Sequence, residues 1–499
     1  MRLLRSVLLC LPLASLLACT AGGDPEDSDA LPPNLLFVSI DTLRADVLGC
    51  YGSEAGASPV LDGLAERGLR FASAWAHSPK TAPSHMTMFT GLPPRAHGLG
   101  NQRSSGAQTL ATSVTTLAES LGRAGYRTGA VTSGGNIKGY LGFERGFDHL
   151  DEKPGQPPGK LQRMGDWIRS AASPAEGQAA RPWFALFHTY AVHDPYLPPK
   201  KFRKRYADPD YDGGIVGDPV ELSKRVQGGE DLAPWATSHA KAAENFWARV
   251  DQDDATDLAY LRQLYLAGVA SFDFQLGRFL DELGAEGLLD NTIVVVTSDH
   301  GEEFGEHGDT RHNSVWREHL HVPLLVILPD SMQLDPALAR GRVVEPAVRH
   351  MDLMPSILEL LGLDATGLVD HTMLGESWAA WVHDPAAEEP GRPVYGEHRS
   401  RLEEPLDIWS LRADGFLMIQ AEPGAEPVLV DLAANGLELV DGELVPGALD
   451  PADPKYAELK DLQLQLLGRF QSSAEHIGVG TGVELSPEAR AELEALGYL

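Results

Sequence analysis

The chain has 499 residues, of which 43% are hydrophobic and 22% are charged, the balance of a protein that buries a large core. A chain of this length holds roughly two to four domain-sized units. Acidic residues outnumber basic ones by 71 to 41, and the formal net charge is −30. Because nucleic acids and anionic membrane surfaces repel such a field, the composition argues against both as partners. An anionic substrate would need a local cluster of cations or a metal ion.

The N-terminus has the pattern of an export signal. Two arginines precede an apolar stretch, Val7–Leu17, which is too short to span a bilayer as a mature helix. Leu16–Cys19 closes this stretch and resembles a bacterial lipobox. We therefore expect a signal peptide over residues 1–18 and lipid on Cys19, with plain secretion as the alternative.

This signal also predicts where the mature chain works. Residues 19–33 are polar and contain Pro and Gly, as expected of a flexible tether. If Cys19 carries lipid, Cys50 has no intramolecular partner, and we expect no disulfide. The expected location is the bacterial cell envelope, facing the periplasm or the cell surface.

The first predicted strand is Asn34–Ile40, a nearly continuous apolar run typical of a parallel strand that is covered on both faces. Asp41 follows it directly. Open α/β sheets bind their ligands at the carboxyl ends of strands, so Asp41 is a candidate ligand, although an Asp after a strand is usually a helix cap. Residues Pro59–Gly68 then predict a short amphipathic helix.

The stretch from His77 to Gly91 carries the candidate nucleophile, Thr81. Pro83 suits the first position of a helix, and Gly91 suits its end. Thr81 would then lie just ahead of a helix N-terminus, where free N–H groups and the helix dipole favour an anion. A capped surface helix is the alternative.

Strand and helix patterns then alternate along the chain. Residues 200–255 between them are polar and irregular, and we expect a substrate-side insertion there. The predicted elements are strands at Thr128–Thr132, Pro182–His188, Thr292–Thr297 and Val322–Leu328, and helices at Thr115–Ala124, Asp257–Leu283 and Met351–Leu363. This alternation indicates a doubly wound α/β sheet with helices on both faces.

A second acidic site follows the strand Thr292–Thr297, as the pair Asp299 and His300. At one edge of the sheet, these two residues would join Asp41 and Thr81 as the ligands of a divalent metal. The metal would lower the pKa of the Thr81 hydroxyl. The imidazole favours zinc or manganese over calcium, which remains a possible ion.

Five ordered motifs resemble landmarks of the sulfatase family, in the alkaline phosphatase superfamily. They are Asn34–Gly52, Thr81–Gly91, Pro94–Gly98, His193–Tyr196 and Thr297–Gly308. The resemblance implies an α/β fold, an alkaline-phosphatase-like three-layer α/β/α sandwich with a mostly parallel central sheet. It also implies a catalytic domain over residues 34–385 and a C-terminal subdomain over residues 390–499, with a small antiparallel sheet and a helix.

The chain departs from the family pattern at the nucleophile. The family uses Cys or Ser, oxidised to formylglycine, followed by x-Pro-Ser-Arg, whereas this chain has Thr81 and His85. Threonine cannot be converted, so no formylglycine is expected. The candidate site residues Asp41, Thr81, Asp299 and His300 therefore resemble those of superfamily members with a threonine nucleophile. A threonine ester must be cleaved by water at phosphorus or sulfur, and a metal site performs that step readily for a phosphoryl group.

The resemblance also implies roles for residues around Thr81. His193 would protonate the leaving group or bind a non-bridging oxygen, and His85 occupies the position of the family's arginine. His312 falls where the family often has a substrate-contacting Lys or His. Weaker candidates for anion contacts are Lys80, Asn136 and Lys138. A solvated surface position is the alternative for these outer residues, and we expect one metal.

Three functions remain open on the sequence. The first is a hydrolase of sulfate or phosphate esters that acts through Thr81, with a small anionic ester or an envelope glycan or lipid as substrate. The second is a transferase of phospho-substituents in the envelope, although such transferases usually carry several transmembrane helices. The third is an inactive binding protein, against which the costly buried carboxylates argue.

Overall fold

The computed structural model describes residues 31–100, 107–173, 176–222, 243–388, 391–400, 406–432, 439–440, 443–444, 450–478 and 480–483. Residues Pro32–Leu499 form one compact unit. The predicted signal peptide, residue Cys19 and most of the tether lie outside the described residues. Within the described part, no helix combines the length and apolar character needed to cross a membrane.

An eight-stranded sheet forms the centre of this unit, in the order β13-β2-β12-β8-β1-β7-β5-β6. Neighbouring strands run parallel, except that β12 is antiparallel to both β8 and β2. The strands are β1 Asn34–Ile40, β2 Leu69–Phe71, β5 Arg127–Val131, β6 His149–Asp151, β7 Trp183–Thr189, β8 Thr292–Thr297, β12 Leu324–Ile327 and β13 Arg342–Val344. The predicted mostly parallel sheet is thus confirmed.

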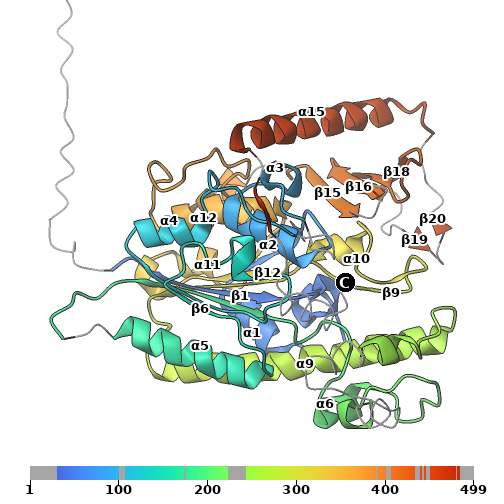
Figure 1. The fold of residues 1–499 in the computed structure, drawn as a ribbon, viewed down its shortest axis with the longest axis horizontal. Coiled ribbons are helices and arrows are strands. Elements are labelled where there is room, and N and C mark those ends of the chain that lie inside the picture. The colour runs from blue at the N-terminus through green and yellow to red at the C-terminus, as the bar shows by residue number, and fades with distance from the viewer. Residues whose placement is uncertain are drawn as a thin grey trace, which may run out of the picture. The chain divides into compact units, whose positions relative to one another are not determined.

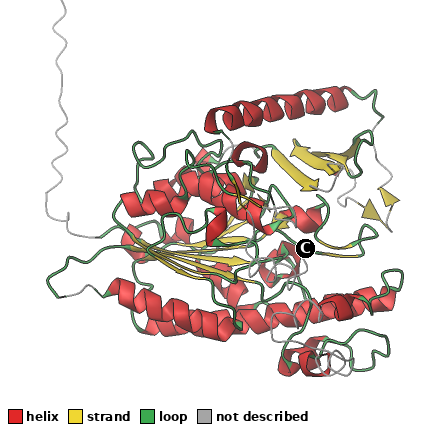
Figure 2. Ribbon diagram, in the orientation of Figure 1, coloured by secondary structure: helices red, strands yellow, loops and turns green. Residues whose placement is uncertain are grey.

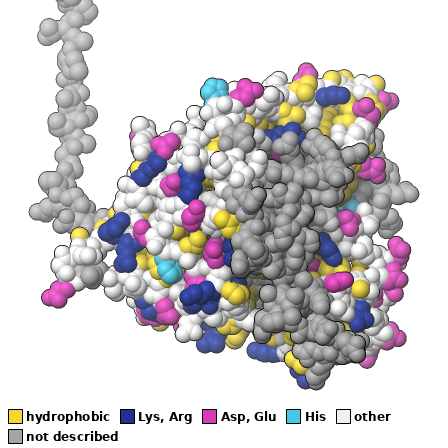
Figure 3. Space-filling model, viewed as in Figure 1, with side chains coloured by type: hydrophobic (Ala, Val, Ile, Leu, Met, Phe, Trp, Pro, Cys, Tyr) yellow, Lys and Arg dark blue, Asp and Glu magenta, His cyan; other side chains and the backbone are white. Residues whose placement is uncertain are grey.

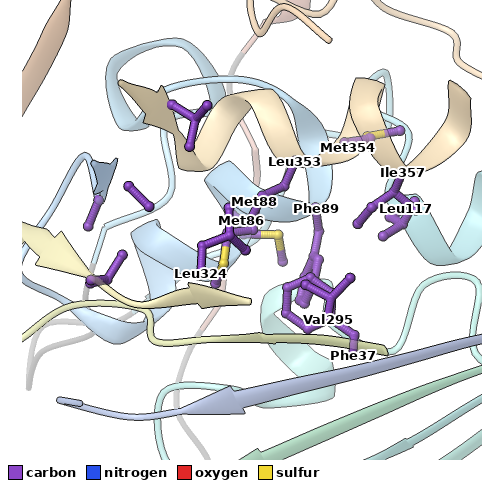
Figure 4. Packing of buried hydrophobic residues seen from close by; sticks show 14 of the residues in the cluster. Phe37, Met86, Met88, Phe89, Leu117, Val295, Leu324, Leu353, Met354 and Ile357 are labelled. Carbon is purple, nitrogen blue, oxygen red and sulfur yellow. The ribbon is translucent and has the colours of Figure 1, made fainter. Parts of the chain in front are cut away.

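Helices cover both faces of the sheet, as Figures 1 and 2 show. One face carries α1 Pro59–Arg67, α5 Pro157–Ala172 and α9 Ala255–Ala285, and the other carries α2 Thr81–Thr90, α4 Leu117–Arg123 and α12 Leu353–Leu360. Alternate residues of β1 supply both cores. Phe37 packs with α2, as Figure 4 shows, whereas Leu36 and Val38 pack on the opposite side. The three-layer α/β/α arrangement is therefore confirmed.

The start of α2 differs from the prediction. The helix begins at Thr81, with Lys80 as the N-cap, so Pro83 is its third residue and not its first. Proline is tolerated there because the first four N–H groups of a helix have no intrahelical partner. Gly91 ends the helix as predicted, with a φ of 67° that glycine adopts at low cost.

The C-terminal part forms the predicted small antiparallel sheet and helix. The sheet order is β15-β16-β17-β18, and the long helix is α15. Their bounds are β15 Val394–Ser400, β16 Leu406–Ala413, β17 Phe416–Gln420, β18 Val428–Asp431 and α15 Pro454–Ile477. The boundary between 34–385 and 390–499 stays a prediction.

The smaller elements complete the chain. They include the short helices α3 Pro94–His97, α6 Lys200–Tyr206, α10 Arg317–Leu320, α11 Pro336–Ala339 and α13 Ala379–His383, and the short strands β3 Ala74–Trp75, β4 Ala107–Gln108, β9 Glu303–Phe304, β10 Thr310–Arg311, β11 His321–Val322, β14 Val348–Arg349, β19 Leu439–Val440, β20 Glu443–Leu444 and β21 Gly482–Val483. The segment 200–255, predicted to be irregular, begins with the helix α6, and this helix packs on α9. On the face drawn in Figure 3, acidic and basic side chains of described residues are interspersed.

Candidate functional site

Three adjacent strands bring polar residues to one edge of the sheet. Asp41 follows β1, Asp299 follows β8, and His188 lies near the end of β7. Strands β8 and β7 flank β1 on its two sides, both parallel to it, so their carboxyl ends meet at the same edge. In this register, His188 is the partner of Ser39, two residues before Asp41. Ligands of open α/β sheets bind at such an edge.

Asp41, Asp299 and His300 present ligand atoms that all lie within 4.8 Å of one another. All three residues are fully buried. His300 Nδ1 lies 2.9 Å from the carbonyl oxygen of Gly301, which only accepts, so the proton is on Nδ1 and Nε2 keeps its lone pair. Asp299 Oδ1 accepts hydrogen bonds from the N–H of His300 at 3.0 Å and of Thr42 at 3.3 Å.

The remaining atoms of this group fit a metal ion. Asp41 Oδ1, Asp299 Oδ2 and His300 Nε2 have no hydrogen-bond partner among the residues that the structure describes. Buried polar atoms without partners are costly, and a cation would satisfy all three of these at once. Two carboxylate oxygens and one imidazole nitrogen are a donor set that zinc and manganese accept. The residues present therefore fit a divalent metal.

The electrostatics of the two carboxyl groups lead to the same conclusion. Burial by itself would raise the pKa of Asp41, but a hydrogen bond from His188 and the charges of His193 and His300 lower it. Burial and the charge of Asp41 raise the pKa of Asp299 well above its usual value. Burial lowers the pKa of His300 to about 4. Two neighbouring carboxyl groups resist ionising together, and a cation between them removes that penalty.

Thr81 lies at the positive end of α2 and is fully buried. Its Oγ1 has no hydrogen-bond partner among the described residues. His85 links Thr81 to the acidic group, because its Nδ1 lies 2.8 Å from the carbonyl oxygen of Thr81 and 3.6 Å from Asp299 Oδ2. Its Nε2 lies 2.8 Å from Ser39 Oγ. Protein atoms therefore engage both nitrogens of His85, the residue at the position of the family's arginine.

His193 is held by the carboxyl group of the next residue. Its Nδ1 lies 3.0 Å from Asp194 Oδ1 and 2.8 Å from the main-chain oxygen of Asp194. Burial opposes a charge on the ring, but the charge of Asp194 and its hydrogen bond raise the pKa of His193 to about 10. His193 is therefore an imidazolium at neutral pH and can donate a proton.

The His312 ring contacts both His300, a candidate metal ligand, and His193, the candidate acid. Its ring centroid lies 4.7 Å from that of His300 and 5.1 Å from that of His193. Burial and the charge of Lys80 hold the pKa of His312 well below its usual value. Lys80 Nζ also donates a hydrogen bond of 2.9 Å to Asn313 Oδ1. The predicted anion contacts Lys80 and His312 thus lie beside the metal-ligand candidates.

The contacts of the other two candidates lead elsewhere. Lys138 Nζ lies 3.9 Å from Glu152 Oε2, an ion pair at the end of β6. The main-chain N–H of Asn136 donates to Tyr190 Oη at 3.1 Å, and the Tyr190 ring packs against His193. The side-chain amide of Asn136 is fully buried and has no hydrogen-bond partner among the described residues.

The sequence analysis missed two buried residues of the site. His188 Nε2 lies 3.3 Å from Asp41 Oδ2, and Glu302 Oε1 lies 3.0 Å from His312 Nδ1. A signal existed for His188, because it is the last residue of the predicted strand Pro182–His188. Residues at the carboxyl ends of strands are candidate ligands, which is the argument that selected Asp41. Glu302 had no such signal, because its role depends on a hairpin that the sequence pattern does not show.

The chain is similar to known proteins in both sequence and fold. The family model "Sulfatase" matches residues 33–363. An arylsulfatase of Clostridium perfringens is 22% identical over 413 residues, which cover 71% of this chain and 81% of the relative. The solved phosphonate monoester hydrolase of Agrobacterium radiobacter superposes with a TM-score of 0.64 at 20% identity, covering 91% of this chain and 98% of that one.

A further solved structure is of a protein in complex with its substrate D-glucosamine-2-N,6-O-disulfate. It superposes with a TM-score of 0.63 at 18% identity, covering 89% of this chain and 97% of that one. These likenesses confirm the alkaline-phosphatase-like fold. The family model spans most of the chain and includes every candidate metal ligand and the nucleophile position. The chain therefore belongs to the sulfatase family and is an ester-hydrolysing enzyme.

Proposed function

We propose that this enzyme hydrolyses phosphate or sulfate esters through Thr81 as the nucleophile, with phosphate esters favoured. The observation that carries the proposal is the set of buried atoms without partners among the described residues: Thr81 Oγ1, Asp41 Oδ1, Asp299 Oδ2 and His300 Nε2. Such atoms cost stability unless a metal and a substrate satisfy them. This cost also argues against an inactive binding protein.

In the proposed reaction, Thr81 Oγ1 attacks as an alkoxide and forms a bond to phosphorus or sulfur while the bond to the leaving oxygen breaks. The free N–H groups at the start of α2 stabilise the negative charge that develops there. His193 donates its proton to the leaving oxygen, and Lys80 and His312 hold the anionic oxygens. Water then attacks the phosphorus or sulfur and gives one proton to His193, and the bond to Thr81 Oγ1 breaks to return the alkoxide. His85 acts as a positioning residue that holds the backbone of Thr81.

Asp41, Asp299 and His300 would hold one divalent metal, zinc or manganese in preference to calcium, with Thr81 completing the set. When bound, the metal lowers the pKa of the attacking hydroxyl group and neutralises charge on the ester oxygens. The preference for phosphate follows from Thr81 itself. A formylglycine adduct collapses at carbon, whereas a threonine ester requires attack by water at phosphorus or sulfur.

The natural substrate in this proposal is a small anionic ester or an envelope glycan or lipid. A structural neighbour bound to a disulfated glucosamine supports a sugar ester. We further propose that lipid on Cys19 anchors the exported enzyme in the cell envelope. Labelled fatty acid incorporated into the wild-type chain and absent from Cys19→Ser tests the anchor.

The nucleophile is tested with the mature chain loaded with manganese or zinc. Turnover of an aryl phosphodiester, an aryl phosphomonoester and an aryl sulfate is compared with that of Thr81→Ala, for which we expect a loss of at least about 1,000-fold. Thr90→Ala is the matched control, since Thr90 lies buried on the same helix and its Oγ1 bonds to the main chain of Met86 and Leu92. Full activity of Thr81→Ala refutes the nucleophile, and turnover of sulfate alone refutes the preference for phosphate.

A further inference from the structure

A short hairpin follows the loop that carries His300. Strands β9 and β10 pair antiparallel, with Arg311 opposite Glu303. Glu302 directly precedes β9 and His312 directly follows β10, so the hairpin brings these two residues together at its open end.

The backbone of Glu302 is fixed on both sides. Its N–H donates to the carbonyl oxygen of Glu318 at 3.1 Å, and its carbonyl oxygen accepts a hydrogen bond of 3.0 Å from Arg44 Nη1. Its side chain is fully buried, and Oε1 lies 3.0 Å from His312 Nδ1. A carboxyl group held in this way is a rigid partner for an imidazole ring.

This contact decides which nitrogen of His312 is available to the site. When Nδ1 accepts from the Glu302 carboxyl group, the hydrogen of the neutral ring is on Nε2, which is the atom left to bind an anionic ligand. The His312 ring lies against both His300 and His193, so it stands between the candidate metal ligands and the candidate acid. Without a partner at Nδ1, the ring loses the contact that fixes its rotation about its own axis.

We propose that Glu302 is a positioning residue that holds the imidazole of His312 at Nδ1, so that Nε2 carries the ring hydrogen and donates it to an anionic oxygen of the substrate. The inference rests on the proposed function, which places His312 at the substrate. Glu302 itself touches no substrate atom. It acts on substrate affinity through His312 alone, so removing it has no further effect once His312 is absent.

The neighbouring residue provides a matched control. Glu303 is also buried, and its Oε2 lies 3.3 Å from His319 Nε2. This second Glu–His pair involves the same hairpin but does not include His312. A substitution that merely disturbs the hairpin should therefore act equally at Glu302 and Glu303.

The experiment is a double-mutant cycle in the metal-loaded mature chain with Glu302→Ala, His312→Ala and the double variant. The readouts are KM and kcat for an aryl phosphodiester and the affinity for inorganic phosphate by calorimetry. We expect Glu302→Ala to raise KM and weaken phosphate binding by roughly 10- to 100-fold, with a smaller change in kcat. Glu302→Gln keeps a donor to Nδ1 in its amide N–H and restores affinity relative to Glu302→Ala, whereas the control Glu303→Ala leaves both readouts unchanged.

The proposal would be overturned if Glu302→Ala weakened phosphate binding equally with and without His312. It would also be overturned if Glu302→Gln bound phosphate as weakly as Glu302→Ala. Wild-type protein that binds no phosphate overturns it as well. Suppose that the wild-type chain binds phosphate and that the double-mutant cycle in phosphate affinity is as expected, but that no ester is hydrolysed. That result refutes the proposed reaction and leaves the Glu302–His312 pairing supported.

Discussion

The charge of His193 depends mainly on the carboxyl group of Asp194, with smaller contributions from Asp41 and Glu302, and removing Asp194's charge is the most direct test of the proposed acid. Burial opposes the imidazolium, but the charge of Asp194, 3.0 Å from Nδ1, raises the pKa of His193 to about 10. Asp194→Asn keeps the shape of the side chain and removes its charge. The pKa of His193 should then fall toward its ordinary value of 6.5, because burial lowers it while the remaining charges of Asp41 and Glu302 raise it.

The size of the effect follows from this difference. A fall from about 10 to about 6.5 corresponds to about 5 kcal/mol of lost stabilisation of the imidazolium. A general acid works below its pKa and is lost as the pH rises through it. At pH 8 the protonated fraction of His193 would therefore fall from nearly complete to about 3%, a loss of about 30-fold in any step that needs the proton.

The assay measures kcat against pH from about 6 to about 10 for aryl esters with good and poor leaving groups. Only poor leaving groups need a proton from His193, so the loss of about 30-fold should be confined to them. Trp247→Phe is the control, because it removes the indole donor 2.5 Å from Asp194 Oδ2 and keeps the carboxylate. An unchanged pH profile in Asp194→Asn, or an equal loss for all leaving groups, would refute this role.

Further predictions concern the metal site and the stability of the fold. Gly301→Ala places a Cβ atom 1.9 Å from the carbonyl oxygen of Glu318 and displaces the loop of Asp299, so calorimetry should show a stability loss of roughly 1–3 kcal/mol and weaker metal binding. Unchanged metal affinity would contradict it. Burial raises the pKa of Asp273 from 3.8 to about 6, so its contribution to stability is complete below pH 3.8 and is lost as the pH rises through about 6. Urea unfolding should show this loss of about 3 kcal/mol, and Asp273→Asn should abolish it. Chelation should lower the melting temperature by leaving Asp41 and Asp299 to repel each other, and an unchanged Tm would count against the metal site.

Local chemistry explains what the sequence predicted well. Strands β1 and β8 match their predicted ranges residue for residue, because both are apolar runs bounded by polar residues. The rule that ligands lie at strand ends then selected Asp41 and Asp299 without knowledge of the sheet order. The start of α2 was predicted two residues late, because a proline is compatible with each of the first positions of a helix and cannot by itself mark the first one.

The sequence by itself determined the layered fold and the family resemblance, because both are marked by local patterns. It also selected Asp41, Asp299 and His300, whose ligand atoms meet in the structure. Only the tertiary structure decided the partners of those residues. His188 lies 147 positions from Asp41, and the parallel register of β7 on β1 brings them together. The pairing of Glu302 with His312 likewise depends on the register of a hairpin whose strands are too short to leave a periodic signal. Contacts between segments distant in the chain follow from packing, which apolar periodicity constrains but does not specify.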